Sequence, residues 1–281
     1  MQGITSGDVM ETNITIIVDN KSVEGIQGEW GLSILIRYEG KNILLDAGAS
    51  NLFLENMKKL GIDVKDIDYA ALSHAHYDHA NGLPAFLENN EKAKLYIRSS
   101  TSTDCYAKKF IFKKYIGIPR KMLDQYSDRI EMVSGDYKLM DGVWLLPHKT
   151  KGLDSIGRRE LMFRKSPGGW VPDDFSHEQS LVVDTDKGLV ILNSCSHGGA
   201  ANIINEVKST FPEKKVYGLI GGFHLFNKTE EEIRELAGKI RETGIEYICT
   251  GHCTKDRAFN ILKEELGDIA AQMKVGYQIV I

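Results

Sequence analysis

A short histidine-rich loop carries the strongest chemical signal in the sequence. The segment HAHYDH at residues 74–79 holds three of the chain's eight histidines and one carboxylate. It follows a predicted strand, and histidines two positions apart at a strand end point the same way. Neutral imidazoles and a carboxylate are ligands for zinc, iron or manganese. The spacing therefore predicts that His74 and His76 share one metal ion, while Asp78 and His79 face a second.

Apolar residues elsewhere alternate between strand and helix patterns. Period-two patterns predict strands at 14–18, 33–38, 42–45, 68–72, 180–183, 189–193, 215–220, 246–250 and 275–281. Helical spacing predicts helices before Gly61, over 200–209, after a Thr229–Glu232 capping box and over 255–266, with Ser50 as the first N-cap. Two similar β/α halves favour an α/β fold with two packed sheets and helices outside, a four-layer αββα sandwich.

The least regular part of the chain, about 98–176, is interpreted as a possible lid within a single domain spanning 1–281. Residues 92–130 hold ten basic residues against three acids, interleaved with tyrosines and phenylalanines. Beside a metal site, that mixture suits a substrate with an aromatic ring and a phosphate or carboxylate. The alternative is a solvated basic face with its aromatics turned inward.

Six motifs together resemble one branch of the metallo-β-lactamase superfamily. They are GLSILI at 31–36, LLDAG at 44–48, LSHAHYDH at 72–79, NSCSH at 193–197, GGFHL at 221–225 and GHCT at 251–254. This branch contains dihydropterin-type ribofuranosylaminobenzene phosphate synthase and uncharacterised metal-dependent hydrolases. The resemblance spans nearly the whole chain except the middle segment, and it implies the same αββα fold.

The resemblance also implies a site for two divalent transition metal ions, with zinc preferred and manganese or iron as alternatives. A further histidine for the first ion is His197 or His177, and we favour His197. Cys195 stands where the superfamily has a bridging Asp or Cys. The implied metal ligands are His74, His76, Asp78, His79, Cys195, His197 and His252.

Four other residues near these motifs are interpreted more openly. Asp46 is expected to hold the histidine loop by hydrogen bonds from outside the coordination shell, although a turn-starting Asp would look the same. His224 is assigned to the site, as a ligand or a catalytic substrate contact. Cys249 and Cys253 flank His252 without a Cys-x-x-Cys pair, so both are interpreted as core thiols.

Composition excludes several classes of protein. The 35 Lys and Arg against 39 Asp and Glu give a net charge of −4, which offers no overall attraction to nucleic acid or an anionic membrane. Four cysteines and the absence of an apparent export signal favour a cytoplasmic protein with thiols or metal ligands. No apolar run approaches the roughly 20 residues needed to cross a bilayer.

The first hypothesis is therefore an enzyme, a metal-dependent hydrolase. Metal-bound hydroxide would attack an ester, phosphoester or lactone-like bond of a small anionic substrate, with Asp78 orienting it. The second hypothesis is a transferase or lyase like the pterin-pathway synthase, acting on a phosphorylated aromatic substrate. A third is a metal-dependent ligand sensor without turnover. The sequence leaves the substrate, the native metal and the oligomeric state open.

Overall fold

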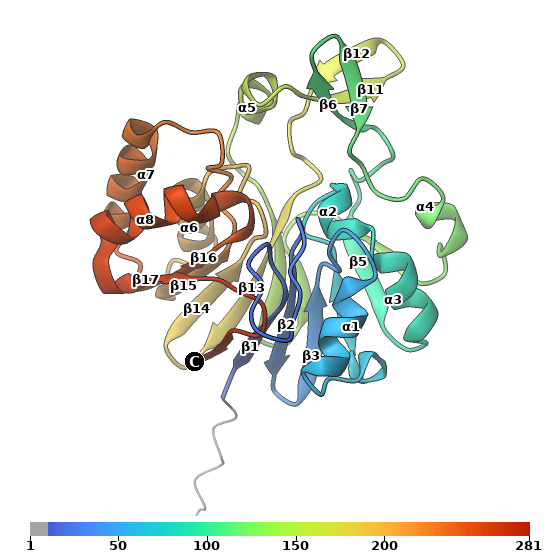
Figure 1. Cartoon of the computed structure of the whole chain (residues 1–281), viewed down its shortest axis with the longest axis horizontal. Coiled ribbons are helices and arrows are strands. Elements are labelled where there is room, and N and C mark those ends of the chain that lie inside the picture. Colours follow the sequence, from blue (N-terminus) through green and yellow to red (C-terminus); the bar gives the residue numbers. More distant parts are fainter. Residues whose placement is uncertain (1–10) are drawn as a thin grey trace, which may run out of the picture.

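Two seven-stranded sheets form the centre of the computed structural model, which describes residues 11–281 (Figure 1). The first has the order β18-β1-β2-β3-β4-β5-β8, with bounds β1 Asn13–Val18, β2 Ser33–Tyr38, β3 Lys41–Leu45, β4 Tyr69–Ala71, β5 Lys94–Arg98, β8 Ile130–Val133 and β18 Gln278–Val280. The second has the order β17-β16-β15-β14-β13-β10-β9, with bounds β9 Tyr137–Met140, β10 Val143–Pro147, β13 Gln179–Thr185, β14 Gly188–Leu192, β15 Val216–Gly221, β16 Tyr247–Thr250 and β17 Ala270–Gln272.

Helices cover the outer faces of both sheets (Figure 1). The first sheet carries α1 (Leu52–Lys59) and α3 (Leu83–Asn89), and the second carries α6 (Ala200–Thr210), α7 (Glu230–Glu242) and α8 (Lys255–Leu266). The shorter helices are α2 (Tyr77–Ala80), α4 (Met122–Gln125) and α5 (Leu153–Arg159). This arrangement confirms the predicted four-layer αββα fold.

The two-residue period of the strands divides their side chains between separate cores. In β2, Ile34 and Ile36 join Val190 of β14 in the core between the two sheets. Leu35 faces the other way and packs in the core that includes α1, while Ile191 packs against α6, α7 and α8. Both faces of each sheet are therefore buried, which accounts for the nearly continuous apolar runs in these strands.

A small third sheet lies apart from the two large ones, at the top of Figure 1. It has the order β12-β11-β6-β7, with bounds β6 Cys105–Lys109, β7 Phe112–Tyr115, β11 Met162–Ser166 and β12 Gly169–Pro172. The middle segment is thus more regular than the sequence predicts, because β8, β9 and β10 also belong to the large sheets. The buried side chains of Val143 and Leu145 explain why β10 is a core strand.

The N-termini of two helices test how well the sequence predicts helix caps. Thr229 and Glu232 form the predicted capping box, in which the Thr229 hydroxyl accepts from the Glu232 amide and the Glu232 carboxylate accepts from the Thr229 amide. At α1, however, Ser50 is not the N-cap; Asn51 takes that position without a side-chain cap. The Ser50 hydroxyl still accepts from the Leu52 amide at 3.1 Å, and it donates to Glu29 at 2.7 Å, so it satisfies an amide of the first turn from one position before the N-cap.

Parallel pairing brings distant loops to one edge. β3 pairs in parallel with β4, and β14, β15 and β16 form a parallel run. The carboxyl ends of parallel neighbours lie at the same edge, so the loops after these strands meet. No helix within residues 11–281 has the length and apolarity needed to cross a bilayer.

Candidate metal centre

Three imidazoles from two loops form the first ligand group. His74 and His76 come from the loop after β4, and His197 follows β14; their ligand atoms lie within 4.8 Å of one another. Within the part of the chain that the structure describes, the Nε2 atoms of all three are buried without a hydrogen-bond partner. Burial and the neighbouring histidines hold the pKa of His74 and of His197 well below the usual value, and lower that of His76 to about 4. Neutral imidazoles keep the lone pair that a metal ion needs.

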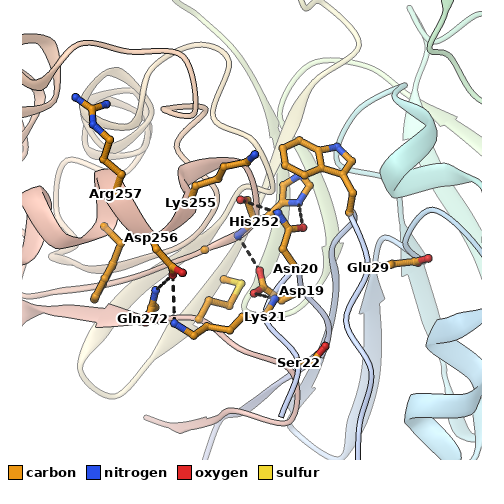
Figure 2. Close-up of a pocket in the computed structure, with 14 residues that line it drawn as sticks. Asp19, Asn20, Lys21, Ser22, Glu29, His252, Lys255, Asp256, Arg257 and Gln272 are labelled. Atoms are coloured by element: carbon orange, nitrogen blue, oxygen red, sulfur yellow. Dashed lines mark hydrogen bonds and ion pairs between the residues drawn. The ribbon is translucent and has the colours of Figure 1, made fainter.

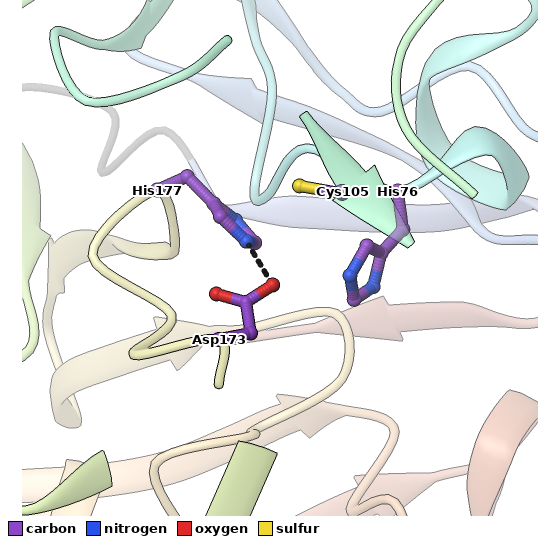
Figure 3. A group of neighbouring side chains, drawn as sticks. All are labelled: His76, Cys105, Asp173 and His177. Carbon is purple, nitrogen blue, oxygen red and sulfur yellow. Dashed lines mark hydrogen bonds and ion pairs between the residues drawn. The ribbon is translucent and has the colours of Figure 1, made fainter. Parts of the chain in front are cut away.

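His177, the alternative to His197, is engaged elsewhere (Figure 3). The Ala75 amide donates to its Nδ1 at 3.1 Å, and its Nε2 lies 3.2 Å from Asp173 Oδ2. Asp173, His177, Cys105 and His76 also lie close enough together to hold an ion. With Nδ1 accepting, however, Nε2 carries the proton and donates it to Asp173. These contacts favour His197 as the partner of His74 and His76.

The second ligand group contains a carboxylate and a thiol. His79 Nε2 lies 3.7 Å from Asp78 Oδ2 and 3.3 Å from Cys195 Sγ. His252 Nε2 lies 3.5 Å from the same Asp78 oxygen. Burial raises the pKa of Asp78, but His79 and His252 outweigh it and hold the pKa well below its usual range. Asp78 is therefore an anion at neutral pH, as a metal-ligating carboxylate must be.

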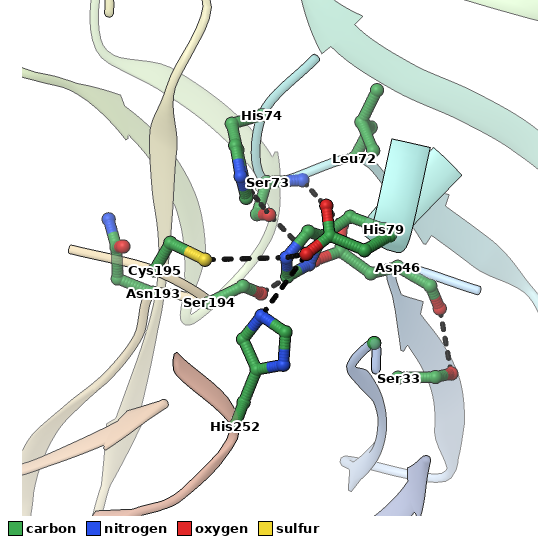
Figure 4. Close-up of polar contacts among 12 residues, drawn as sticks. Ser33, Asp46, Leu72, Ser73, His74, His79, Asn193, Ser194, Cys195 and His252 are labelled. Carbon is green, nitrogen blue, oxygen red and sulfur yellow. Dashed lines mark hydrogen bonds and ion pairs between the residues drawn. The ribbon is translucent and has the colours of Figure 1, made fainter. Parts of the chain in front are cut away.

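Asp46 holds the second group from behind, as Figure 4 shows. Its carboxylate accepts from the Ser73 amide at 2.7 Å, from the hydroxyls of Ser73 and Ser194 at 2.6 Å each, and lies 2.8 Å from His79 Nδ1. His79 thus presents Nε2 toward the centre, the usual arrangement of a metal-ligating imidazole with an outer carboxylate. His74 and His252 are oriented in a similar way. The Nδ1 atom of His74 lies 2.9 Å from Ser73 Oγ, and that of His252 lies 3.1 Å from Asn20 Oδ1.

A second buried acid supports His197. Glu178 Oε1 accepts from the His197 amide at 3.2 Å, and the other Glu178 oxygen contacts His148 Nε2. His148 Nδ1 lies 3.2 Å from Glu206. Burial lowers the pKa of His148, but the two carboxylates outweigh it and raise the pKa to about 9. The ring of His197 is further fixed by stacking on Phe175, with centroids 4.4 Å apart.

Backbone strain concentrates around the centre. Asp46, Ser196, His224 and His252 all have left-handed φ angles, between 48° and 61°. Such conformations cost of order 1–3 kcal/mol each for non-glycine residues and persist where surrounding contacts fix them. All four follow strand ends, so the strain accompanies the turns that direct these side chains inward.

A cavity of about 130 Å³ is lined by several of these ligands and, on its other sides, largely by apolar side chains. Ala107, Ile116 and Met162 line it from the middle segment, and Trp30 and Phe226 from elsewhere. The basic residues of 92–130 are absent from its lining. Several are used structurally: Arg129 donates to the carbonyls of Asn90 and Ala93, for example.

Two larger pockets adjoin this cavity. One of about 320 Å³ shares His197 and His224 with it and includes Arg159, Glu160 and Lys228. The ring of His224 lies 4.4 Å from that of His197, and its Nε2 lies 3.8 Å from Glu160. Glu160 follows α5 in the middle segment, and no motif in the sequence marks it.

The other pocket, of about 730 Å³, shares Trp30 and His252 with the cavity (Figure 2). The Lys255 ammonium lies 5.1 Å from the centroid of Trp30, and Arg257 also lines this pocket. Lys21, which also lines it, is paired with Asp256 and Gln272. The three cations of this lining are matched by Asp19, Glu29 and Asp256, so the pocket carries no excess of positive charge. The Trp30 ring with the Lys255 ammonium beside it suits a ring-bearing ligand.

The donor set fits divalent transition metals. Unpartnered buried imidazole nitrogens are costly unless something occupies them. Here they converge with an anionic carboxylate and a thiol, which together suit zinc or iron better than magnesium or calcium. Sequence reasoning found these residues but missed Glu178 and His148, which lie far from any metal motif.

Comparison with known proteins identifies the family of the chain. Residues 31–252 match the family model described as the metallo-beta-lactamase superfamily. The chain is 32% identical to the 7,8-dihydropterin-6-methyl-4-(beta-D-ribofuranosyl)-aminobenzene-5'-phosphate synthase of Methanocaldococcus jannaschii, over 88% of each protein. A crystal structure described as a metal-dependent hydrolase of the beta-lactamase superfamily is 29% identical, with a TM-score of 0.83 over 96% of this chain and 99% of that one.

A more distant structure shares only the fold. It is a diphosphatase of the PhnP family, 13% identical with a TM-score of 0.54, covering 95% of this chain and 97% of that one. From the matched family model, the similarity over most of its length and the fold, the chain belongs to the metallo-β-lactamase superfamily.

Proposed function

We propose that this protein is a metal-dependent hydrolase acting on an ester, phosphoester or lactone-like bond of a small anionic substrate. The observation that carries the proposal is the convergence of unpartnered imidazole nitrogens and the Asp78 carboxylate on one small cavity. We propose two divalent ions, zinc in preference to manganese or iron, with His74, His76 and His197 holding one. Asp78, His79, His252 and Cys195 would hold the other.

Divalent ions held in this way lower the pKa of water toward neutrality and polarise the bond under attack. The chain's own residues would do the rest. Asp78 supplies an anionic oxygen that accepts a hydrogen bond from the attacking water and orients it. His224 stands at the boundary of the cavity and the 320 Å³ pocket, where its ring can contact the substrate. That pocket is also lined by the ion pairs of Lys228 with Glu160 and of Arg159 with Glu232, which offer polar groups to a substrate.

The test is turnover by metal-loaded protein across a panel of esters, phosphodiesters, diphosphates and lactones. We expect activity on at least one class, lowered at least about 100-fold in His76→Ala. Asp268→Ala is the matched control, because that side chain is fully exposed and away from the cavity. No turnover of any substrate in the panel, or equal activity in the parent and His76→Ala, would refute the proposal that the protein is a hydrolase.

A synthase-like reaction is the second candidate, and a specific observation favours it. Two pockets of unequal size adjoin the same cavity, one through His197 and His224 and the other through Trp30 and His252. That layout suits a reaction that joins two substrates, and the 32% identical relative is named as a synthase. Inorganic pyrophosphate or a pterin diphosphate should then raise the melting temperature through linked binding. No shift at millimolar ligand would remove this candidate, whereas a shift without any product would favour a sensor.

A further inference from the structure

Two thiols meet at the metal centre, although the sequence predicts that one of them belongs to the core. Cys195 follows β14 and Cys253 follows β16, and their Sγ atoms lie 3.5 Å apart. Both side chains are almost completely buried. The parallel run of β14, β15 and β16 sets this approach, because it places both strand ends at one edge.

The loop after β15 is shaped around the Cys253 sulfur. The His224 amide donates to Cys253 Sγ at 3.2 Å. A Cβ atom at Gly222 would lie 2.5 Å from the same sulfur, so only glycine leaves room for it there. Backbone amides commonly donate hydrogen bonds to thiolate ligands of metals, since they stabilise the negative charge on the sulfur.

Cys249, four residues earlier, shows what a core thiol looks like in this chain. It lies among apolar side chains of both sheets, in the core between them. Cys253 instead lines the cavity over the metal ligands, together with Cys195 and His252. The ligand atoms of these three residues lie within 4.8 Å of one another.

We propose that Cys253 is a second thiolate ligand of the centre, added to Cys195, His252, His79 and Asp78 of the second group. The inference rests on the proposed metal site and adds a ligand to it. On binding, the thiol gives up its proton to solvent and the sulfur donates its electron pair to the ion. Two thiolates make this ion's site softer than the imidazole group and favour zinc or iron over manganese.

Cobalt substitution tests the proposal. Thiolate bound to Co²⁺ gives a sulfur-to-metal charge-transfer band, and we expect Cys253→Ser and Cys195→Ser each to lose about half of its intensity. Cys249→Ser is the matched control and should keep all of it. If Cys253→Ser keeps the full band, Cys253 is not a ligand and the proposal fails while the metal site stands.

A measurement on zinc-loaded protein guards against a variant that misfolds. X-ray absorption of Cys195→Ser should still show a sulfur neighbour at about 2.3 Å from zinc, and the Cys195→Ser/Cys253→Ser double variant should show none. Loss of the sulfur shell in Cys195→Ser alone would overturn the inference. So would a Cys195–Cys253 disulfide in the metal-loaded parent, found by peptide mass mapping. Failure of the parent to take up any metal would refute the metal site and this inference together.

Discussion

The two ligand groups of the candidate centre differ in charge and in how the protein holds them. His74, His76 and His197 are neutral imidazoles, whereas the second group adds the anionic Asp78 and a thiol. Asp46 anchors the second group directly through His79. The second group should therefore attract its ion electrostatically through Asp78. The first group should hold its ion only through the placement of three imidazole lone pairs.

The anchors differ as well. Asp46 accepts only neutral donors and an imidazole, all fully buried. Glu178, which supports His197, belongs instead to a buried chain of charges with His148 and Glu206. Asp46 is thus the common acceptor of several hydrogen bonds, whereas Glu178 belongs to an ion pair that titrates with pH. Substitutions at the two sites should therefore affect stability in different ways.

Removing the Asp46 carboxylate should have the largest effect. Asp46→Ala leaves the Ser73 amide, two hydroxyls and His79 Nδ1 without their acceptor in a buried site. We expect a loss of about 3 to 5 kcal/mol in unfolding free energy, measured by urea denaturation of the metal-free protein. Affinity for the second ion should fall about 10- to 100-fold. A change under 1 kcal/mol, matching the Asp268→Ala control, would show that Asp46 is only a turn residue.

The ion pair behind His197 should make stability depend on pH. The pKa of His148 is about 9 in the folded protein and about 6.5 when unfolded. Its raised pKa stabilises the fold fully below pH 6.5, and this contribution disappears as pH rises through 9. We expect this contribution, measured as the difference in unfolding free energy between the parent and His148→Gln, to fall by up to about 3 kcal/mol between pH 6.5 and 9.5.

His148→Gln is the matched variant for that pH series. Glutamine retains hydrogen-bonding capacity but does not titrate, so its unfolding free energy should be flatter over the same range. Urea denaturation at several pH values measures both proteins. Equal slopes in parent and variant would place the titrating group elsewhere.

A substitution far from both ligand groups serves as a control for destabilisation without a change at the metal centre. Thr229→Ala removes the hydroxyl from the α7 capping box. We expect about 1 kcal/mol less unfolding free energy by urea denaturation, with metal content unchanged. Loss of metal in this variant would mean that any destabilisation of the fold releases metal. Metal content could not then distinguish the role of Asp46 from that of Glu178.

The sequence allowed one half of the site to be predicted more fully than the other. The loop at 74–79 presents its four ligands within six positions, so spacing alone indicates a metal site. The residues after β14, β15 and β16 come from separate strand ends, and the register between parallel strands decides which side chains meet. The sequence therefore left His177 and His197 as alternatives and placed Cys253 in the core.

The layers could be predicted because apolar periodicity in the large sheets is local and strong. The small sheet could not, since β6, β7, β11 and β12 are short and mostly half-exposed. Its contribution to the cavity, through Ala107 and Met162, carries no chemical signature in the sequence. Whether this segment moves as a lid stays a prediction.

Elemental analysis tests the central claim most directly. Protein purified without added metal or chelator should hold about two equivalents of a transition metal, falling toward one in Asp78→Ala and in Cys195→Ala. That result would support two ligand groups that differ as described. A parent that contains no metal, and takes up none on incubation with zinc, manganese or iron, would contradict the account.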